Sequence, residues 1–117
     1  MAKILIVDDD RTTADLLKMM LELDGFEVVL VWQGVHVLNA VEQHRPDLVL
    51  MDYNLHDVQG VEVLRQLRQH PLFQRLPVII GSGMNVGAEV IQAGATDFLI
   101  KPYDPDDLTR RLRQIVK

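Results

Sequence analysis

Residues 3–10 read KILIVDDD, a short apolar run that ends in three acidic residues. Four further apolar runs of similar length recur along the chain, separated by longer stretches in which apolar and polar residues alternate with a helical period. Short continuous apolar runs rich in branched residues predict strands that are buried on both faces of a parallel sheet. The predicted strands are Lys3–Val7, Glu27–Val31, Leu48–Met51, Val78–Ile80 and Phe98–Ile100.

The stretches between these runs predict helices. They are Arg11–Leu23, Gly34–His44, Val61–Gln69, a shorter helix between Asn85 and Ala93, and Asp104–Val116. Gly25, Pro46 and Pro71 follow three of them, and glycine or proline is typical just past the end of a helix. Strands that alternate with helices predict an α/β fold with right-handed crossovers. We therefore expect a flavodoxin-like, doubly wound (βα)5 fold with a five-stranded parallel sheet, forming one domain over residues 1–117.

The overall composition limits the classes of function. A chain of 117 residues that is 48% hydrophobic can bury one core. It has no cysteine, which excludes a disulfide framework and a thiolate nucleophile and fits a cytoplasmic protein. The formal net charge of −5 disfavours direct binding to nucleic acid or to a membrane, so a protein or small-molecule partner is expected. The first apolar run is too short for a signal peptide or a membrane span.

The glycine-rich stretch at residues 78–87, VIIGSGMNVG, raises a nucleotide-binding alternative. Its spacing is close to G-x-G-x-x-G, but its last glycine lies one residue too far along. A dinucleotide-binding loop is also expected after the first strand, and the strand that follows such a loop is expected to end in an acidic residue. Here the strand that follows the glycine-rich stretch ends in Lys101 and Pro102 instead. A flavin phosphate is disfavoured too, because the acids after the first strand would repel it.

Chemically active side chains follow most of the predicted strands. They are Asp8, Asp9 and Asp10 after the first strand, Asp52 after the third, Ser82 after the fourth and Lys101 after the fifth. In doubly wound sheets the carboxyl ends of the strands form the binding edge. Carboxylates gathered there repel one another unless a cation compensates, and hard oxygen ligands suit Mg²⁺. A lysine and a hydroxyl add donors for an anion, so the pattern indicates a site for a metal ion and a phosphate.

In combination these motifs resemble the receiver domain of bacterial two-component response regulators, such as the chemotaxis regulators, over essentially the whole chain. The motifs are the acids at residues 8–10, LVLMDYNLHDVQG at residues 48–60, the serine that follows PVII at residues 77–80, and AGATDFLIKPY at residues 93–103. Each alone is common, but together they occur at successive strand ends in the order of the family.

The resemblance implies a role for each of these positions. Asp52 would be the phosphoacceptor, and Lys101 would pair with the incoming phosphoryl oxygens. Ser82 would hydrogen-bond one of those oxygens, while Gly83 and Asn54 would complete the phosphate-binding set. Gly81 and Gly83 would let the backbone pass close to the phosphate. The implied Mg²⁺ ligands are Asp8, Asp9, Asp52 and the backbone carbonyl of Asn54.

The resemblance also implies how the domain would signal. Phosphoryl transfer to Asp52 from a histidine kinase or a phosphotransfer protein would draw in Ser82, and Phe98 would turn inward as the aromatic switch residue. An ordinary core role for Phe98 is the alternative. The face of the fourth helix, fifth strand and fifth helix would then contact a downstream protein or a covalently linked output domain, with a homodimer left open. The bond between Lys101 and Pro102 would be cis.

Such a protein is not an enzyme in the usual sense, since it catalyses only its own phosphorylation and dephosphorylation. The alternative is a pseudo-receiver, an interaction module that keeps the fold and signals without phosphorylation. Asp10 is expected to cap the first helix rather than to bind metal.

Three features depart from the family pattern. Ser82 and Lys101 are 19 positions apart, about three fewer than usual or roughly one helical turn, which predicts a short fourth helix and a non-standard output or dimer face. His56 stands where proline is common. Met84 is apolar where several relatives carry a polar residue that orients water, which predicts a moderately long-lived phosphoryl group.

Overall fold

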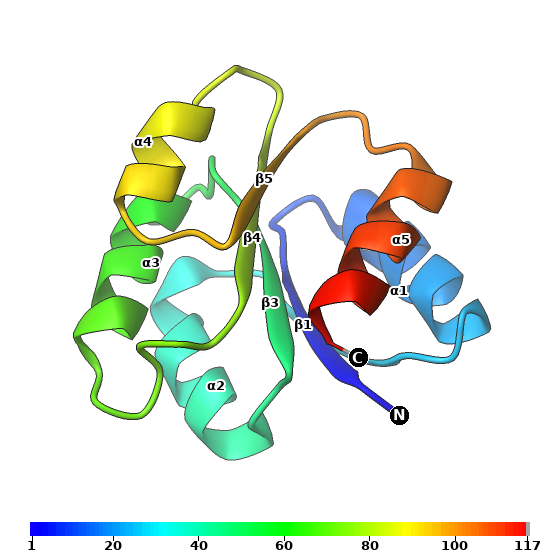
Figure 1. The fold of residues 1–117 in the computed structure, drawn as a ribbon, viewed down its shortest axis with the longest axis horizontal. Helices are drawn as coiled ribbons and strands as arrows, with labels where there is room; N and C mark the ends of the chain where they lie inside the picture. The colour runs from blue at the N-terminus through cyan, green and yellow to red at the C-terminus, as the bar shows by residue number, and fades with distance from the viewer. Residues whose placement is uncertain (117) are drawn as a thin grey trace.

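A parallel sheet forms the centre of the protein in the computed structural model, which describes residues 1–116 (Figure 1). Every neighbouring pair of strands is parallel, and the order is β2-β1-β3-β4-β5. The direction of strand order switches between β1 and β3, which confirms the predicted doubly wound, flavodoxin-like fold. The five strands are β1 (Lys3–Val7), β2 (Glu27–Val31), β3 (Leu48–Asp52), β4 (Val78–Ser82) and β5 (Asp97–Ile100).

Three of the strands extend further than the sequence predicts. β3 includes Asp52, β4 includes Gly81 and Ser82, and β5 begins at Asp97. The backbone ladder continues through these residues, because Asp52 pairs with Gly81 and the Tyr53 N–H donates to the Gly81 carbonyl at 2.8 Å. A change from apolar to polar side chains therefore does not mark the end of strand pairing here.

Helices cover both faces of the sheet (Figure 1). α1 (Arg11–Leu23) and α5 (Pro105–Ile115) lie on one face, and α2 (Val37–His44), α3 (Gly60–Gln69) and α4 (Gly87–Gln92) lie on the other. α4 has six residues, as short as expected. Beyond α1, Gly25 has a φ of +94°, which glycine adopts without strain. Among residues 1–116 no helix is long and apolar enough to cross a membrane.

The segment predicted as one helix from Gly34 to His44 begins instead with a separate 3-10 turn, η1 (Gly34–His36). Asp57, in the loop after β3, accepts the backbone N–H groups of Gly34 and Val35, both at 3.0 Å. Burial raises the pKa of Asp57, but these donors and the Val58 N–H together outweigh burial and lower the pKa. A contact across 23 positions thus holds the turn, and local periodicity contains no sign of it.

Two apolar cores lie on the two faces of the sheet because side chains alternate along each strand. In β3, Leu48 and Leu50 pack toward α1 and α5, on what we call the α1–α5 face. Val49 and Met51 pack toward α2, α3 and α4, on the α2–α4 face. By the same alternation Asp52 continues the row on the α1–α5 face, at the carboxyl end of the strand.

Candidate functional site

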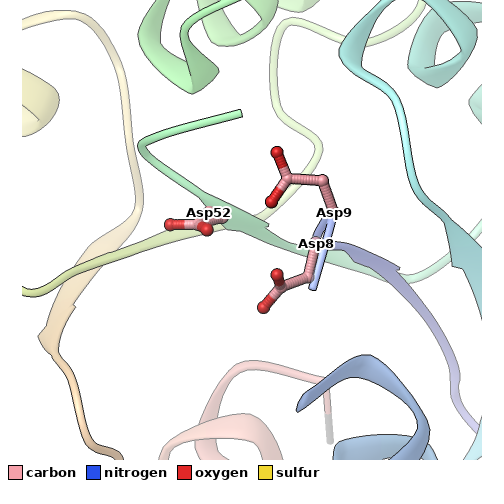
Figure 2. A group of neighbouring side chains, drawn as sticks. All are labelled: Asp8, Asp9 and Asp52. Atoms are coloured by element: carbon pink, nitrogen blue, oxygen red, sulfur yellow. The ribbon is translucent and has the colours of Figure 1, made fainter. Parts of the chain in front are cut away.

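Three carboxylates meet where β1 and β3 end at the same edge of the sheet (Figure 2). Asp8 and Asp9 follow β1, and Asp52 is the last residue of β3. One oxygen from each lies within 4.8 Å of the corresponding oxygens of the other two. Asp8 is buried, and Asp9 and Asp52 are partly buried. Negative charges this close together repel one another, so the site favours a compensating cation.

Lys101, which follows β5, brings a positive charge to this cluster. Its ammonium nitrogen lies 3.3 Å from Asp8 Oδ2 and 3.2 Å from Asp52 Oδ2. The bond between Lys101 and Pro102 is cis, as the resemblance implies. Burial raises the pKa of Asp52, and the attraction of Lys101 only partly offsets burial and the repulsion from Asp8. The single ammonium group therefore leaves the carboxylates undercompensated.

The donor set fits a hard divalent cation such as Mg²⁺. The three side chains in the cluster all offer carboxylate oxygens, the ligands that Mg²⁺ prefers. Asn54 also lies beside the cluster, because its backbone N–H donates to Asp52 Oδ1 at 3.3 Å. The structure thus brings together the four residues named from the sequence as ligands, Asp8, Asp9, Asp52 and Asn54.

Ser82 and Phe98 lie together on the α2–α4 face. Ser82 is fully buried at the end of β4, and its hydroxyl oxygen accepts the N–H of Met84 at 3.1 Å. Phe98 is partly buried against the core of this face and packs over Gly87, where an added Cβ would lie 3.0 Å from the ring. Gly83 is exposed, and its missing side chain would meet no atom within 4 Å. The predicted switch pair therefore lies on one side of the carboxylate cluster.

Asp10 caps α1, as the sequence predicts. Its Oδ1 atom accepts the backbone N–H groups of Thr12 at 3.1 Å and Thr13 at 3.3 Å. The backbone and hydroxyl hydrogen bonds from Thr13 lower the pKa of Asp10. This carboxylate is engaged by the helix and lies outside the carboxylate cluster of Asp8, Asp9 and Asp52.

Sequence reasoning misses Tyr103, which lies against the site. Its hydroxyl oxygen is 1.8 Å from the position that a Cβ on Gly81 would occupy, so the ring takes the place of a side chain there. Gly81 therefore makes room for Tyr103. The role implied by the family resemblance was different, because there Gly81 lets the backbone pass close to the phosphate. The sequence feature that could have pointed to Tyr103 is its position as an aromatic residue two positions after Lys101.

Sequence reasoning also misses the contact between His56 and Asp9. The backbone N–H of His56 donates to Asp9 Oδ2 at 2.6 Å, and Nδ1 of its ring lies 2.8 Å from the same oxygen. Proline, which is common at this position in the family, would offer neither group. The sequence shows that histidine replaces the common proline at position 56, but it does not show the contact of His56 with Asp9, 47 positions away.

Comparison with known proteins identifies the family. Residues 4–113 match the family model of the response regulator receiver domain. The chain belongs to this receiver family. The receiver is 34% identical over 114 residues to the DNA-binding response regulator MtrA of Mycolicibacterium paratuberculosis, an alignment that covers 95% of the receiver and 49% of MtrA. It thus spans about half the length of the curated relatives it matches.

Solved receivers share the fold. Chemotaxis response regulator CheY4 of Vibrio cholerae matches the receiver with a TM-score of 0.88 at 27% identity, covering 98% of both chains. The receiver domain of a sensor histidine kinase from Pseudomonas aeruginosa, solved with a magnesium ion coordinated in its active site cleft, has a TM-score of 0.89 at 30% identity. That match covers 98% of this receiver and 97% of the other chain. The protein is therefore a two-component signalling receiver.

Proposed function

We propose that this receiver, acting as one domain in the cytoplasm, accepts a phosphoryl group on Asp52 and catalyses only its own phosphorylation and dephosphorylation. The position of Asp52 carries the proposal, because its carboxylate contacts Lys101 and lies beside Asp8 at the carboxyl edge of the sheet. A carboxylate is an adequate nucleophile for phosphoryl transfer once the charge on the transferring group is neutralised. The donor would be the phosphohistidine of a histidine kinase or of a phosphotransfer protein.

In the transfer step an oxygen of Asp52 bonds to phosphorus as the bond from phosphorus to the donor imidazole breaks. Lys101, already 3.2 Å from Asp52, would pair with the phosphoryl oxygens, and Ser82, Gly83 and Asn54 would surround them. Mg²⁺, when bound, would add positive charge next to the transferring group. Its ligands would be Asp8, Asp9, Asp52 and the backbone carbonyl of Asn54.

Signalling would begin on the α2–α4 face, at Ser82 and Phe98, and would change the surface formed by α4, β5 and α5. The Ser82 oxygen accepts a hydrogen bond from Met84, which leaves its own proton available to donate to a phosphoryl oxygen. α4 is short, with Val90 as its buried residue, and Tyr53 donates a side-chain hydrogen bond to Glu89 on this helix. A helix with so few anchors shifts at low cost. Its surface would contact a downstream protein or a linked output domain.

A groove between α1 and the loop before α5 would receive the phosphodonor. It is lined by Lys101 and by apolar side chains that include Leu16 and Met20, and Leu16 is 56% exposed. A partner that brings phosphohistidine to Asp52 would contact this groove, because it borders the lysine of the site. The net charge of −5 supports a protein partner over nucleic acid or a membrane.

Intact mass spectrometry tests the proposed function. The protein is incubated with Mg²⁺ and a small acyl phosphate, alongside the variant Asp52→Asn. We expect one phosphoryl group on the parent and none on the variant. If the folded parent gains no phosphoryl group, the proposal is wrong and the chain is a phosphorylation-independent interaction module.

A further inference from the structure

The hydroxyl of Tyr103 lies against Gly81, which is the neighbour of the proposed phosphoacceptor in the sheet. Gly81 pairs in register with Asp52 on the neighbouring strand. The Tyr103 oxygen is 1.8 Å from the position where a Cβ on Gly81 would lie. Neighbouring strands are about 4.8 Å apart, and residues in register project to the same face. The hydroxyl therefore lies about 3–7 Å from Cβ of Asp52.

The cores of the sheet place Tyr103 and Asp52 on the same face by an independent route. Tyr103 packs against the core formed with α1 and α5, which also contains Leu50 of β3 and Ile79 of β4. Asp52 and Gly81 each lie two residues after one of these, so alternation directs both to the α1–α5 face. Ser82 faces the opposite side, and its hydroxyl is thus not in competition for the same space.

The hydroxyl is poised as a donor. Burial raises the pKa of Tyr103, and the charges of Asp52 and Asp8 raise it further, with no hydrogen bond within residues 1–116 contributing. The phenol therefore stays protonated at neutral pH. The ammonium nitrogen of Lys101 lies 5.9 Å from the centre of the ring, so lysine and phenol approach Asp52 from the same loop.

We propose that the Tyr103 hydroxyl donates a hydrogen bond to the phosphoryl group carried by Asp52, as a phosphate-binding residue in addition to Lys101 and Ser82. Phosphorylation brings anionic oxygens toward a donor that lies beside the acceptor carboxylate. A hydrogen bond to a charged acceptor at a partly exposed site contributes about tenfold in affinity.

The experiment uses beryllium fluoride, which binds aspartate carboxylates as an analogue of the phosphoryl group. The full chain is titrated with it in the presence of Mg²⁺, and binding is followed by the fluorescence of Trp32, the single tryptophan, which lines a pocket together with Asp9. Tyr103→Phe keeps the ring and removes the hydroxyl. Tyr53→Phe is the matched control, because that hydroxyl bonds Glu89 of α4 instead.

We expect Tyr103→Phe to weaken beryllium fluoride binding about tenfold, while its affinity for Mg²⁺ alone and its thermal midpoint stay unchanged. Tyr53→Phe should stay within about twofold of the parent. Equal binding by Tyr103→Phe and the parent would overturn the inference, and so would an equal loss in both variants or a loss of Mg²⁺ affinity. The inference rests on the proposed function. If the parent itself binds no beryllium fluoride and gains no phosphoryl group, the proposed function fails first.

Discussion

Replacement of Gly81 by alanine tests how closely Tyr103 packs beside the site. A Cβ at position 81 would lie 1.8 Å from the Tyr103 hydroxyl oxygen, 2.7 Å from Cζ and 2.9 Å from Cε1. Favourable carbon contacts begin at about 3.5 Å, so the ring would have to move by more than about 1 Å. The strand cannot move instead, because β4 is paired with β3 and β5 on its two sides.

We expect Gly81→Ala to lower the free energy of unfolding by about 1–2 kcal/mol. Overpacking of a filled site costs about 1–3 kcal/mol. Alanine also restricts the unfolded chain more than glycine does, which offsets about 0.4–1 kcal/mol of that cost. The displaced ring would carry its hydroxyl away from Asp52, so beryllium fluoride affinity should fall as we expect for Tyr103→Phe.

Urea denaturation followed by circular dichroism measures this change. Gly83→Ala is the matched control, because its Cβ would meet no atom within 4 Å, and we expect a change below about 0.5 kcal/mol. Leucine lacks the hydroxyl oxygen and the two ring carbons that clash, so the cost of Gly81→Ala should largely disappear in a Tyr103→Leu background. The steric reasoning would be refuted if Gly81→Ala and Gly83→Ala changed the free energy of unfolding equally. It would also be refuted if Gly81→Ala remained equally destabilising in the Tyr103→Leu background.

Two other contacts and one exposed side chain lead to further expectations. Asp57→Ala should lower the free energy of unfolding by about 1 kcal/mol at neutral pH, as measured by urea denaturation. Because folding lowers the pKa of Asp57, this loss of stability should be complete above the unfolded pKa of about 3.9. It should vanish as the pH falls through the pKa of the folded state. His56→Pro removes the backbone donor and the ring nitrogen that contact Asp9 and compete with Mg²⁺ for it. Calorimetry should therefore show about three- to tenfold tighter Mg²⁺ binding, and weaker binding would contradict this. Leu16→Ser should slow phosphorylation by a kinase and not by a small acyl phosphate, whereas Leu23→Ser, exposed at the far end of α1, should change neither.

The carboxylate and lysine site can be predicted from the sequence because it depends on a regular property of the fold. Asp8, Asp52 and Lys101 each follow or end an apolar run, and parallel strands bring their carboxyl ends to one edge of the sheet. The short α4 is equally visible, because the spacing between Ser82 and Lys101 is set by chain length. Neither conclusion requires knowledge of a side-chain contact.

The contacts of Tyr103, Asp57 and His56 cannot be predicted in the same way. Each joins a loop residue to a distant part of the chain, across 23 positions for Asp57 and Gly34 and 47 for His56 and Asp9. Hydrophobic periodicity records which face of an element is buried and says nothing about the path of a loop. The sequence likewise does not show what fills the space beside a glycine, so it does not reveal that Tyr103 lies against Gly81.

Under the proposed function, the phosphoryl group on Asp52 would be contacted from both faces of the sheet. Ser82 and Phe98 lie on the α2–α4 face with α4, so a hydrogen bond that moves Ser82 acts on the side where that helix packs. Tyr103 packs on the α1–α5 face, where a hydrogen bond to the same group would restrain the loop between β5 and α5. We infer that Tyr103 sets how tightly the phosphoryl group is held, whereas Ser82 sets how far α4 responds. The two properties could then vary independently, because Tyr103 and Ser82 lie on opposite faces of the sheet.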